Sequence, residues 1–289
     1  MTGKATAIAH GAATIVNAMA TGKGAAFGVD LWTKAEVKLT DQPTIIQAEI
    51  TSDPTESTLL IESTVKRVLE HFALDKSFGA KVKTRSNIPI ARGLKSSSTA
   101  ANAVALATTA ALGKTLDDLE IVKIGVEAAF DAKVTLTGAF DDAYASYFGG
   151  IVVTDNLNRE VVKELPFNED LQVLFHVPAK KAYSANADLA RLQTLKPLVE
   201  VVYGQALEGR VWEALSLNGL IYSAALGYDA KIAFDALEAG AVAAGLCGKG
   251  PAVTAITPKE KVNSVKAALQ KHGGEVLEAK LNREKAKVI

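Results

Sequence analysis

At residues 89–101 the chain reads Pro89-Ile90-Ala91-Arg92-Gly93-Leu94-Lys95-Ser96-Ser97-Ser98-Thr99-Ala100-Ala101. A glycine turn is followed here by four hydroxyl residues, and the alanine-rich continuation predicts a helix to about Leu112. Backbone N–H groups at the start of a helix have no acceptor within the helix, so with the helix dipole they make an anion site. Gly93 permits a tight turn, while Arg92 and Lys95 add positive charge. The stretch therefore indicates either a cradle for nucleotide phosphates or a hydroxyl cap on an ordinary buried helix.

The composition is that of a globular protein without a charge bias. The 289 residues suggest about two domains, and 48% of them are hydrophobic. Lys plus Arg and Asp plus Glu both total 32, so the formal net charge is zero. Nucleic acids and anionic membranes usually recruit a basic excess, so this balance argues against both as the main partner.

Three further features narrow the class. Cys247 is the only cysteine, which excludes an internal disulfide and cysteine-based zinc sites. The four histidines stand far apart in the chain, and no apolar run reaches membrane-spanning length. The first ten residues carry no signal-peptide pattern, so we expect a cytoplasmic protein.

The order of predicted elements indicates an α+β protein in two lobes. Strands are predicted at 33–39, 44–51, 80–84, 151–154, 171–177, 252–257 and 275–279, and helices at 54–72, 115–132, 141–147, 182–192, 197–226, 229–239 and 259–272. A polar, turn-rich stretch at 155–159 predicts a boundary between an N-terminal domain, 1–155, and a C-terminal domain, 156–289. The second domain resembles a split βαβ arrangement.

Two acidic features could complete a phosphoryl-transfer site. Magnesium is held by few protein oxygens plus nucleotide phosphates, so the Ser97 hydroxyl and the carboxylate of Glu127 would suffice. The alternative for Glu127 is a solvated helix face. Asp141 and Asp142 open a helix after the turn at Gly138, where they either cap the helix or orient the proton of an attacking hydroxyl.

A third feature is the run Gly245-Leu246-Cys247-Gly248-Lys249-Gly250-Pro251-Ala252. Three glycines in six residues before a strand can bring backbone close to a ligand, or can form a plain loop. Other nucleotide templates fail. Gly22-Lys23 lacks the preceding glycine of a Walker A loop, and neither a GxGxxG fingerprint nor a GxSxG elbow is present.

Taken together and in this order, the three segments resemble the GHMP kinase superfamily. Its phosphate loop has the pattern Pro-x-x-x-Gly-Leu-Gly-Ser-Ser, which is matched here by Pro89, Gly93, Leu94, Ser96 and Ser97, with Lys95 where glycine is usual. Residues 138–141 and 245–251 match the other two motifs. The resemblance implies a two-lobed fold, with an N-terminal α/β nucleotide-binding lobe and a C-terminal ferredoxin-like lobe.

Within the superfamily the chain most resembles the archaeal type of shikimate kinase. The segments that carry this are Thr21-Gly22-Lys23-Gly24-Ala25-Ala26-Phe27-Gly28-Val29-Asp30, Gly93-Leu94-Lys95-Ser96-Ser97-Ser98, Thr137-Gly138-Ala139-Phe140-Asp141-Asp142-Ala143 and Gly248-Lys249-Gly250-Pro251. The resemblance implies transfer of the ATP γ-phosphoryl group to the 3-hydroxyl of shikimate with Mg²⁺, a step in aromatic amino acid biosynthesis.

The resemblance also implies roles for individual residues. The ATP phosphates would be bound by Pro89, Ile90, Ala91, Arg92, Gly93, Leu94, Lys95, Ser96, Ser97, Ser98 and Thr99, with Gly248 and Gly250 shaping the cleft. Ser97 and Glu127 would lie near magnesium. Asp141 would be the catalytic carboxylate, with Asp142 as its rival, because the count from Asp141 to Gly149-Gly150 is one residue longer than in mevalonate kinase.

The acceptor leaves other choices open. Shikimate carries a carboxylate, and Lys23, Lys180, Lys181 and Arg191 are candidates to face it, with a solvated surface role as the alternative for each. Rival functions are another kinase of the superfamily, such as a homoserine or mevalonate kinase, and a catalytically silent protein that binds a ligand without turnover. The sequence leaves the oligomeric state open, with a homodimer as one option.

Overall fold

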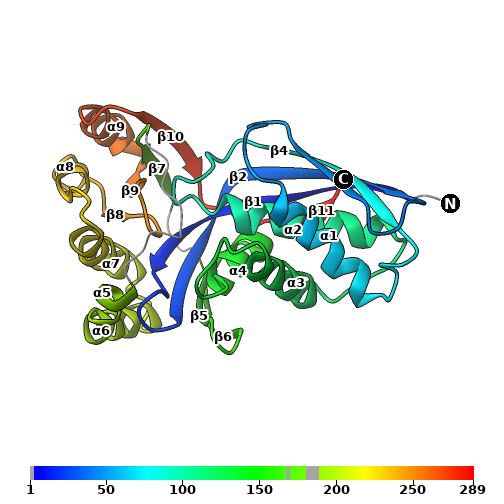
Figure 1. Cartoon of the computed structure of the whole chain (residues 1–289). Helices are drawn as coiled ribbons and strands as arrows, with labels where there is room; N and C mark the ends of the chain where they lie inside the picture. Colours follow the sequence, from blue (N-terminus) through cyan, green and yellow to red (C-terminus); the bar gives the residue numbers. More distant parts are fainter. Residues whose placement is uncertain (1–2, 167–169, 180–188) are drawn as a thin grey trace.

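The computed structural model describes residues 3–166, 170–179 and 189–289, which form two lobes (Figure 1). The larger sheet has the order β11-β1-β2-β4-β3, with β5 beside the first part of β2 and β6 beside β5. Its strands are β1 (Lys4–Val16), β2 (Lys23–Thr40), β3 (Ile46–Ile50), β4 (Gly79–Ser86), β5 (Ile151–Asp155), β6 (Glu160–Leu165) and β11 (Lys287–Val288). The long strand β2 joins both parts of the sheet, because residues 23–27 pair with β5 and residues 33–40 pair with β4.

Four helices lie along the larger sheet; the first, second and fourth contact its strands, and the third packs mainly on the other three helices (Figure 1). They are α1 (Leu59–His71), α2 (Ser96–Ala111), α3 (Asp118–Asp131) and α4 (Phe140–Phe148). Helix α2 contacts both β1 and β2. Ala103 and Ala107, one turn apart on α2, are fully buried, and small side chains of this kind let a helix approach a sheet closely while favouring the helical state. The start of α2 is thereby held in a defined place against the sheet.

The second lobe is built on a four-stranded antiparallel sheet of order β10-β7-β9-β8. Its strands are β7 (Leu171–Val177), β8 (Ala243–Leu246), β9 (Val253–Pro258) and β10 (Glu275–Lys280), and its helices are α5 (Leu189–Gln193), α6 (Lys196–Leu207), α7 (Val211–Leu226), α8 (Lys231–Glu238) and α9 (Val262–Gln270). Along the chain this gives the β-α-β-β-α-β succession of a ferredoxin-like lobe, as expected. A Cβ on Gly219 of α7 would lie 2.3 Å from Gly245 Cα of β8, so glycine is needed at this contact.

Two of the predicted helices are placed differently by the structure. The first begins at Leu59 rather than at Pro54, because the Asp53 carboxylate accepts hydrogen bonds from Thr55 and closes a local turn instead. The helix predicted at 197–226 is two helices, α6 and α7, separated at Glu208–Arg210, where Gly209 has φ 90°. Of the helix predicted at 182–192, residues 182–188 lie outside the described residues.

The strands of the first forty residues were only partly predicted. β1 and the first part of β2 are rich in alanine and almost continuously buried, so they lack the alternation that marks a half-buried strand. The division at residue 155 stays a prediction. The change of sheet falls between β6 and β7, and β11 returns from the end of the chain to pair with β1. Within the described ranges, no helix is long and apolar enough to cross a membrane.

Candidate active site

The segment before α2 forms a tightly curled loop. Ala91, Gly93 and Lys95 have φ values of 55°, 86° and 62°, all in the left-handed region. That conformation is uncommon for residues other than glycine, and strained residues of this kind gather at functional sites. The Lys95 carbonyl accepts hydrogen bonds from both the backbone N–H and the hydroxyl of Thr99, at 3.2 and 3.1 Å, which fixes the first turn of α2. The loop therefore presents the start of α2 as an open helix terminus.

The loop is fastened to the second lobe. The Arg92 carbonyl accepts a hydrogen bond of 3.1 Å from the N–H of Ala252, and the Arg92 guanidinium donates to the carbonyl of Ala179. A Cβ on Gly93 would lie 2.4 Å from the Cys247 carbonyl oxygen, so a side chain at this position would collide with the glycine-rich segment. The first and third sequence motifs are thus in direct contact.

One cavity of about 400 Å³ brings the motifs together. Its wall has a polar part and an apolar part. The polar part includes Asn17, Lys95, Ser96, Ser97, Ser98, Asp141, Asp142, Gly248 and Lys249. The apolar part comes from β3, the start of α1 and the segment around the end of α3, and includes Ile50, Leu59, Leu60, Ala129, Ala132, Val134 and Leu136.

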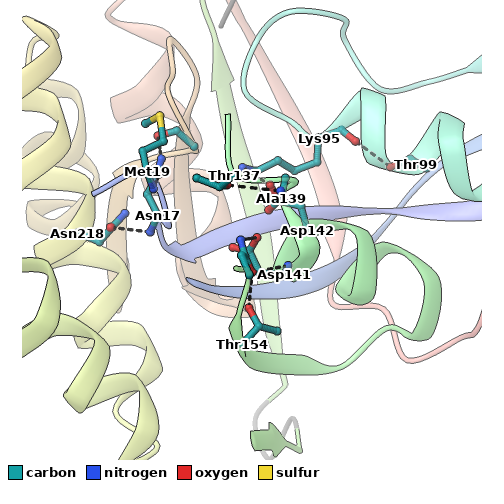
Figure 2. A network of polar contacts seen from close by, with 12 residues as sticks. Asn17, Met19, Lys95, Thr99, Thr137, Ala139, Asp141, Asp142, Thr154 and Asn218 are labelled. Atoms are coloured by element: carbon teal, nitrogen blue, oxygen red, sulfur yellow. Dashed lines mark hydrogen bonds and ion pairs between the residues drawn. The ribbon is translucent and has the colours of Figure 1, made fainter. Parts of the chain in front are cut away.

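Asp141 and Asp142 lie in the first turn of α4 but have different surroundings (Figure 2). The Asn156 amide donates a hydrogen bond of 2.8 Å to Asp141 Oδ1, and the Asp141 N–H donates one of 3.1 Å to Asn156 Oδ1. The other oxygen of Asp141 packs on β2, since a Cβ on Gly24 would lie 2.4 Å from Asp141 Oδ2. Asp141 is therefore held from two sides by β2 and Asn156.

Asp142 is paired with the loop lysine. Lys95 Nζ lies 2.9 Å from Asp142 Oδ2, and the two side chains are only 13% and 9% exposed. The other oxygen, Asp142 Oδ1, is buried and has no hydrogen-bond partner among the described residues. Lys95 extends from the start of α2 toward the carboxylates (Figure 2), and its Nζ would lie 2.7 Å from a Cβ on Gly248. The ion pair therefore stands where all three motifs meet.

The burial of these charges shifts their pKa values. Burial, and next the charge of Asp142, raise the pKa of Asp141 to about 7. Burial alone would lower the pKa of Lys95, but the neighbouring carboxylates outweigh it, and the pKa of Lys95 is raised. Burial and the nearby Lys95 lower the pKa of Lys249 to about 8, against the opposing effect of Asp142. The cavity thus holds a firmly protonated lysine, an acid poised near neutrality and a second, less basic lysine.

The structure brings most of the predicted phosphate-binding and catalytic residues to this cavity. Its wall includes Ile90, Ala91, Gly93, Lys95, Ser96, Ser97, Ser98, Asp141 and Gly248. It does not include Pro89, Arg92, Leu94, Thr99, Gly250 or Glu127. Leu94 and Thr99 are buried. Glu127 forms an ion pair with Arg159 and does not line the cavity, whereas Ser97 does.

The expected cations for an acceptor carboxylate lie elsewhere. The ammonium of Lys23 lies over the ring of Tyr203, 5.8 Å from its centroid, and Arg191 donates to a backbone carbonyl of α7. Neither residue lines the cavity. Lys180 and Lys181 lie outside the described residues.

Sequence reasoning missed three polar side chains at the site. Asn17 connects the lobes, because its side chain donates a hydrogen bond of 2.8 Å to the Gly248 carbonyl and its N–H donates one of 2.9 Å to Asn218 Oδ1. Asn156 holds Asp141, and Lys249 lines the cavity. Only Lys249 had a usable signal, as the single charged residue between the glycines of the third motif.

The chain matches two family models, described as the GHMP kinases N terminal domain at residues 60–150 and the GHMP kinases C terminal at residues 212–275. Among curated proteins it is 45% identical over 288 residues to a shikimate kinase of Methanosarcina mazei and 47% identical over 288 residues to that of Methanosarcina acetivorans. In both cases the match covers 99% of this chain and 97% of the relative.

Solved structures share the fold at low identity. A homoserine kinase of Cytophaga hutchinsonii has a TM-score of 0.74 at 18% identity, covering 99% of this chain and 97% of that protein. The mevalonate kinase of Methanococcus jannaschii has a TM-score of 0.75 at 16% identity, covering 96% and 98%. A structure described as "MDDEF in complex with MVAPP, AMPPCP and Magnesium" has a TM-score of 0.78 at 17% identity, covering 100% and 99%.

Proposed function

This chain belongs to the GHMP kinase family, and from that premise we propose that it is a shikimate kinase, which transfers the γ-phosphoryl group of ATP to the 3-hydroxyl of shikimate. The relatives that are 45% and 47% identical over nearly the whole chain bear the name shikimate kinase. The structural observation that carries the proposal is the single cavity in which the open start of α2 meets the Lys95–Asp142 pair.

The phosphates of ATP fit the start of α2. The backbone N–H groups of Ser96, Ser97 and Ser98 have no acceptor within the helix, and their residues line the cavity. A helix terminus of this kind attracts phosphate oxygens through both its N–H groups and its dipole. The curled backbone at Ala91 and Gly93 lets the chain wrap closely around a phosphate chain. The apolar part of the wall is suited to the adenine base.

Magnesium is proposed to accompany the nucleotide. Within the described ranges, no cluster of three or more His, Cys, Asp or Glu side chains could hold a metal ion. Mg²⁺ needs few protein oxygens when phosphates supply the others. The Ser97 hydroxyl lines the cavity and suits this role. Glu127, the other expected ligand, would have to leave its ion pair with Arg159 to take part. When bound, the ion neutralises phosphate charge.

The carboxylate pair is proposed to handle the acceptor proton. The acceptor oxygen forms a bond to the γ-phosphorus while the bond from that phosphorus to the bridging oxygen of ADP breaks. The hydroxyl proton passes to a carboxylate and then to solvent. The sequence points to Asp141, with Asp142 as the rival, and the contacts favour Asp142, because its Oδ1 is free to accept. Asp141 is held by Asn156 and has a raised pKa, so its proposed role is to position Asp142, not to accept the proton.

The test is ADP release by the purified protein with ATP and Mg²⁺ against shikimate, homoserine, mevalonate and galactose. We expect turnover with shikimate alone. Turnover with another member of the panel would keep the kinase reaction and replace the acceptor. ATP binding without turnover of any acceptor would support the catalytically silent alternative. We also propose that the protein is a cytoplasmic homodimer. Light scattering on the purified protein measures whether its molar mass is that of one chain or of two.

A further inference from the structure

We infer that Lys249 binds the carboxylate of the acceptor and so decides which acceptors the kinase takes. The inference rests on the proposed function, because shikimate is a carboxylate. Lys249 lines the cavity from the loop between β8 and β9. Its ammonium has no hydrogen bond or ion pair with any residue in the described ranges, although the cavity holds carboxylates. A half-buried cation without a counter-ion is a ready partner for an anionic ligand.

The loop that carries Lys249 is held firmly in place. Gly248 and Gly250, on either side of it, have φ values of 59° and 72°. The Gly250 N–H donates a hydrogen bond of 2.9 Å to the Cys247 carbonyl, and the Cys247 N–H donates one of 2.8 Å to the Ala252 carbonyl.

A contact from the other lobe adds to this support. Asn17 follows β1, and its side-chain amide donates a hydrogen bond to the Gly248 carbonyl. The Asn17 N–H donates a second hydrogen bond to the side chain of Asn218 in α7 (Figure 2). A charged group on a loop tied down from both lobes is positioned for binding before the ligand arrives.

The charge distribution leaves Lys249 as the available cation near the carboxylates. Lys95 and Asp142 pair with each other at 2.9 Å, so their charges largely cancel. The burial of Lys249 and the nearby Lys95 make its protonated form less stable, and the pKa of Lys249 is about 8. A carboxylate beside its ammonium would reverse that shift. The third lysine on the wall, Lys133, is exposed and follows α3, next to the apolar part suited to the base.

The position of Lys249 favours the acceptor over ATP. The start of α2 and its serines are the groups proposed to bind the ATP phosphates. Lys249 comes from the opposite lobe and is close enough to Asp142 for their charges to interact. Asp142 is the group proposed to face the acceptor hydroxyl. The carboxylate and the 3-hydroxyl of shikimate stand on ring carbons separated by a single carbon, so one small ring can meet both residues.

The test compares Lys249→Met and Lys249→Arg with Lys23→Met as the matched control, since Lys23 is a cation outside the cavity. Steady-state kinetics are measured with shikimate and ATP varied in turn, and thermal unfolding checks that each variant is folded. Loss of a charge-assisted hydrogen bond predicts that Lys249→Met raises the KM for shikimate about 10- to 100-fold. The KM for ATP should change less than about twofold, and Lys249→Arg should recover part of the loss.

The methyl ester of shikimate supplies a second readout, because it keeps the ring and the 3-hydroxyl but has no carboxylate charge. The wild-type enzyme should prefer shikimate over the ester, and Lys249→Met should lose that preference. An unchanged preference would overturn the inference, as would a raised KM for ATP, which would assign Lys249 to the phosphates. If the wild type ignores shikimate, the proposed function fails. The same comparison on the carboxylate acceptor that it does phosphorylate then decides the role of Lys249.

Discussion

Replacing Asp142 by asparagine should separate catalysis from stability. The substitution keeps the shape of the side chain but leaves the Lys95 ammonium buried without its counter-ion, in a pair whose members are 13% and 9% exposed. Removing one member of a buried ion pair costs about 3–5 kcal/mol. At roughly 2–4 °C per kcal/mol, Asp142→Asn should unfold at least about 6 °C below the wild type. The loss of the group that accepts the hydroxyl proton should lower kcat by about 10²- to 10⁴-fold.

A double variant isolates the two effects. In Asp142→Asn combined with Lys95→Met, the Lys95 ammonium is removed together with its counter-ion, and removing both partners of such a pair is often close to neutral for stability. The unfolding temperature should therefore return toward that of the wild type, while kcat stays low. Thermal unfolding followed by circular dichroism and ADP release under saturating substrates measure the two quantities on the same preparations.

Asp141→Asn provides the comparison that can refute this assignment. Asp141 already shares a hydrogen-bond network with Asn156 and has a raised pKa, so an uncharged amide resembles its protonated form. We expect this variant to lose less than about tenfold in kcat, below the range typical for a lost general base. If Asp141→Asn loses more activity than Asp142→Asn, Asp141 accepts the proton and our reading of the free Asp142 oxygen is wrong.

Because the pKa of Asp141 is raised to about 7, the folded state binds more protons than the unfolded state between about pH 4 and 7. The free energy of unfolding should therefore fall as pH rises through that window. Urea titrations at several pH values measure this dependence, which Asp141→Asn should flatten. The pKa of Lys249 near 8 predicts that kcat/KM for shikimate falls above about pH 8, because the ammonium loses its proton. Lys249→Arg should retain activity at that pH. A wild-type profile of kcat/KM that is flat to pH 9.5 would contradict this prediction. Gly93→Ala would place a Cβ 2.4 Å from the Cys247 carbonyl oxygen at a residue with φ 86°. It should destabilise the fold by more than about 1 kcal/mol, measured by denaturation, and weaken ATP binding, measured by calorimetry. In the control Gly113→Ala, φ is 65° but the space around the Cβ is open, so ATP binding should be unchanged.

Local patterns in the sequence predicted the elements that carry the site. The helix that begins at the hydroxyl-rich run was predicted correctly, because the helix propensity of the alanine run is a local property, although no side chain caps the start of α2. The helix predicted at 115–132 begins at Asp118, where the Asp117 carboxylate accepts a hydrogen bond from the N–H of Leu119. The misplaced start of α1 has a local cause as well, since Asp53 can close a turn as readily as it can cap a helix.

The family, the order of the three motifs and the helices that follow two of them could be predicted from the amino-acid sequence. Which side chains meet depends on how distant segments pack together. Lys95 reaches Asp142 because α2 and α4 pack on the same sheet, and Asn156 reaches Asp141 from the far end of β5. Lys249 arrives from the other lobe. Backbone conformation follows from neighbours in the chain, whereas the burial and pairing of a charge depend on groups that only long-range packing brings within a few ångströms.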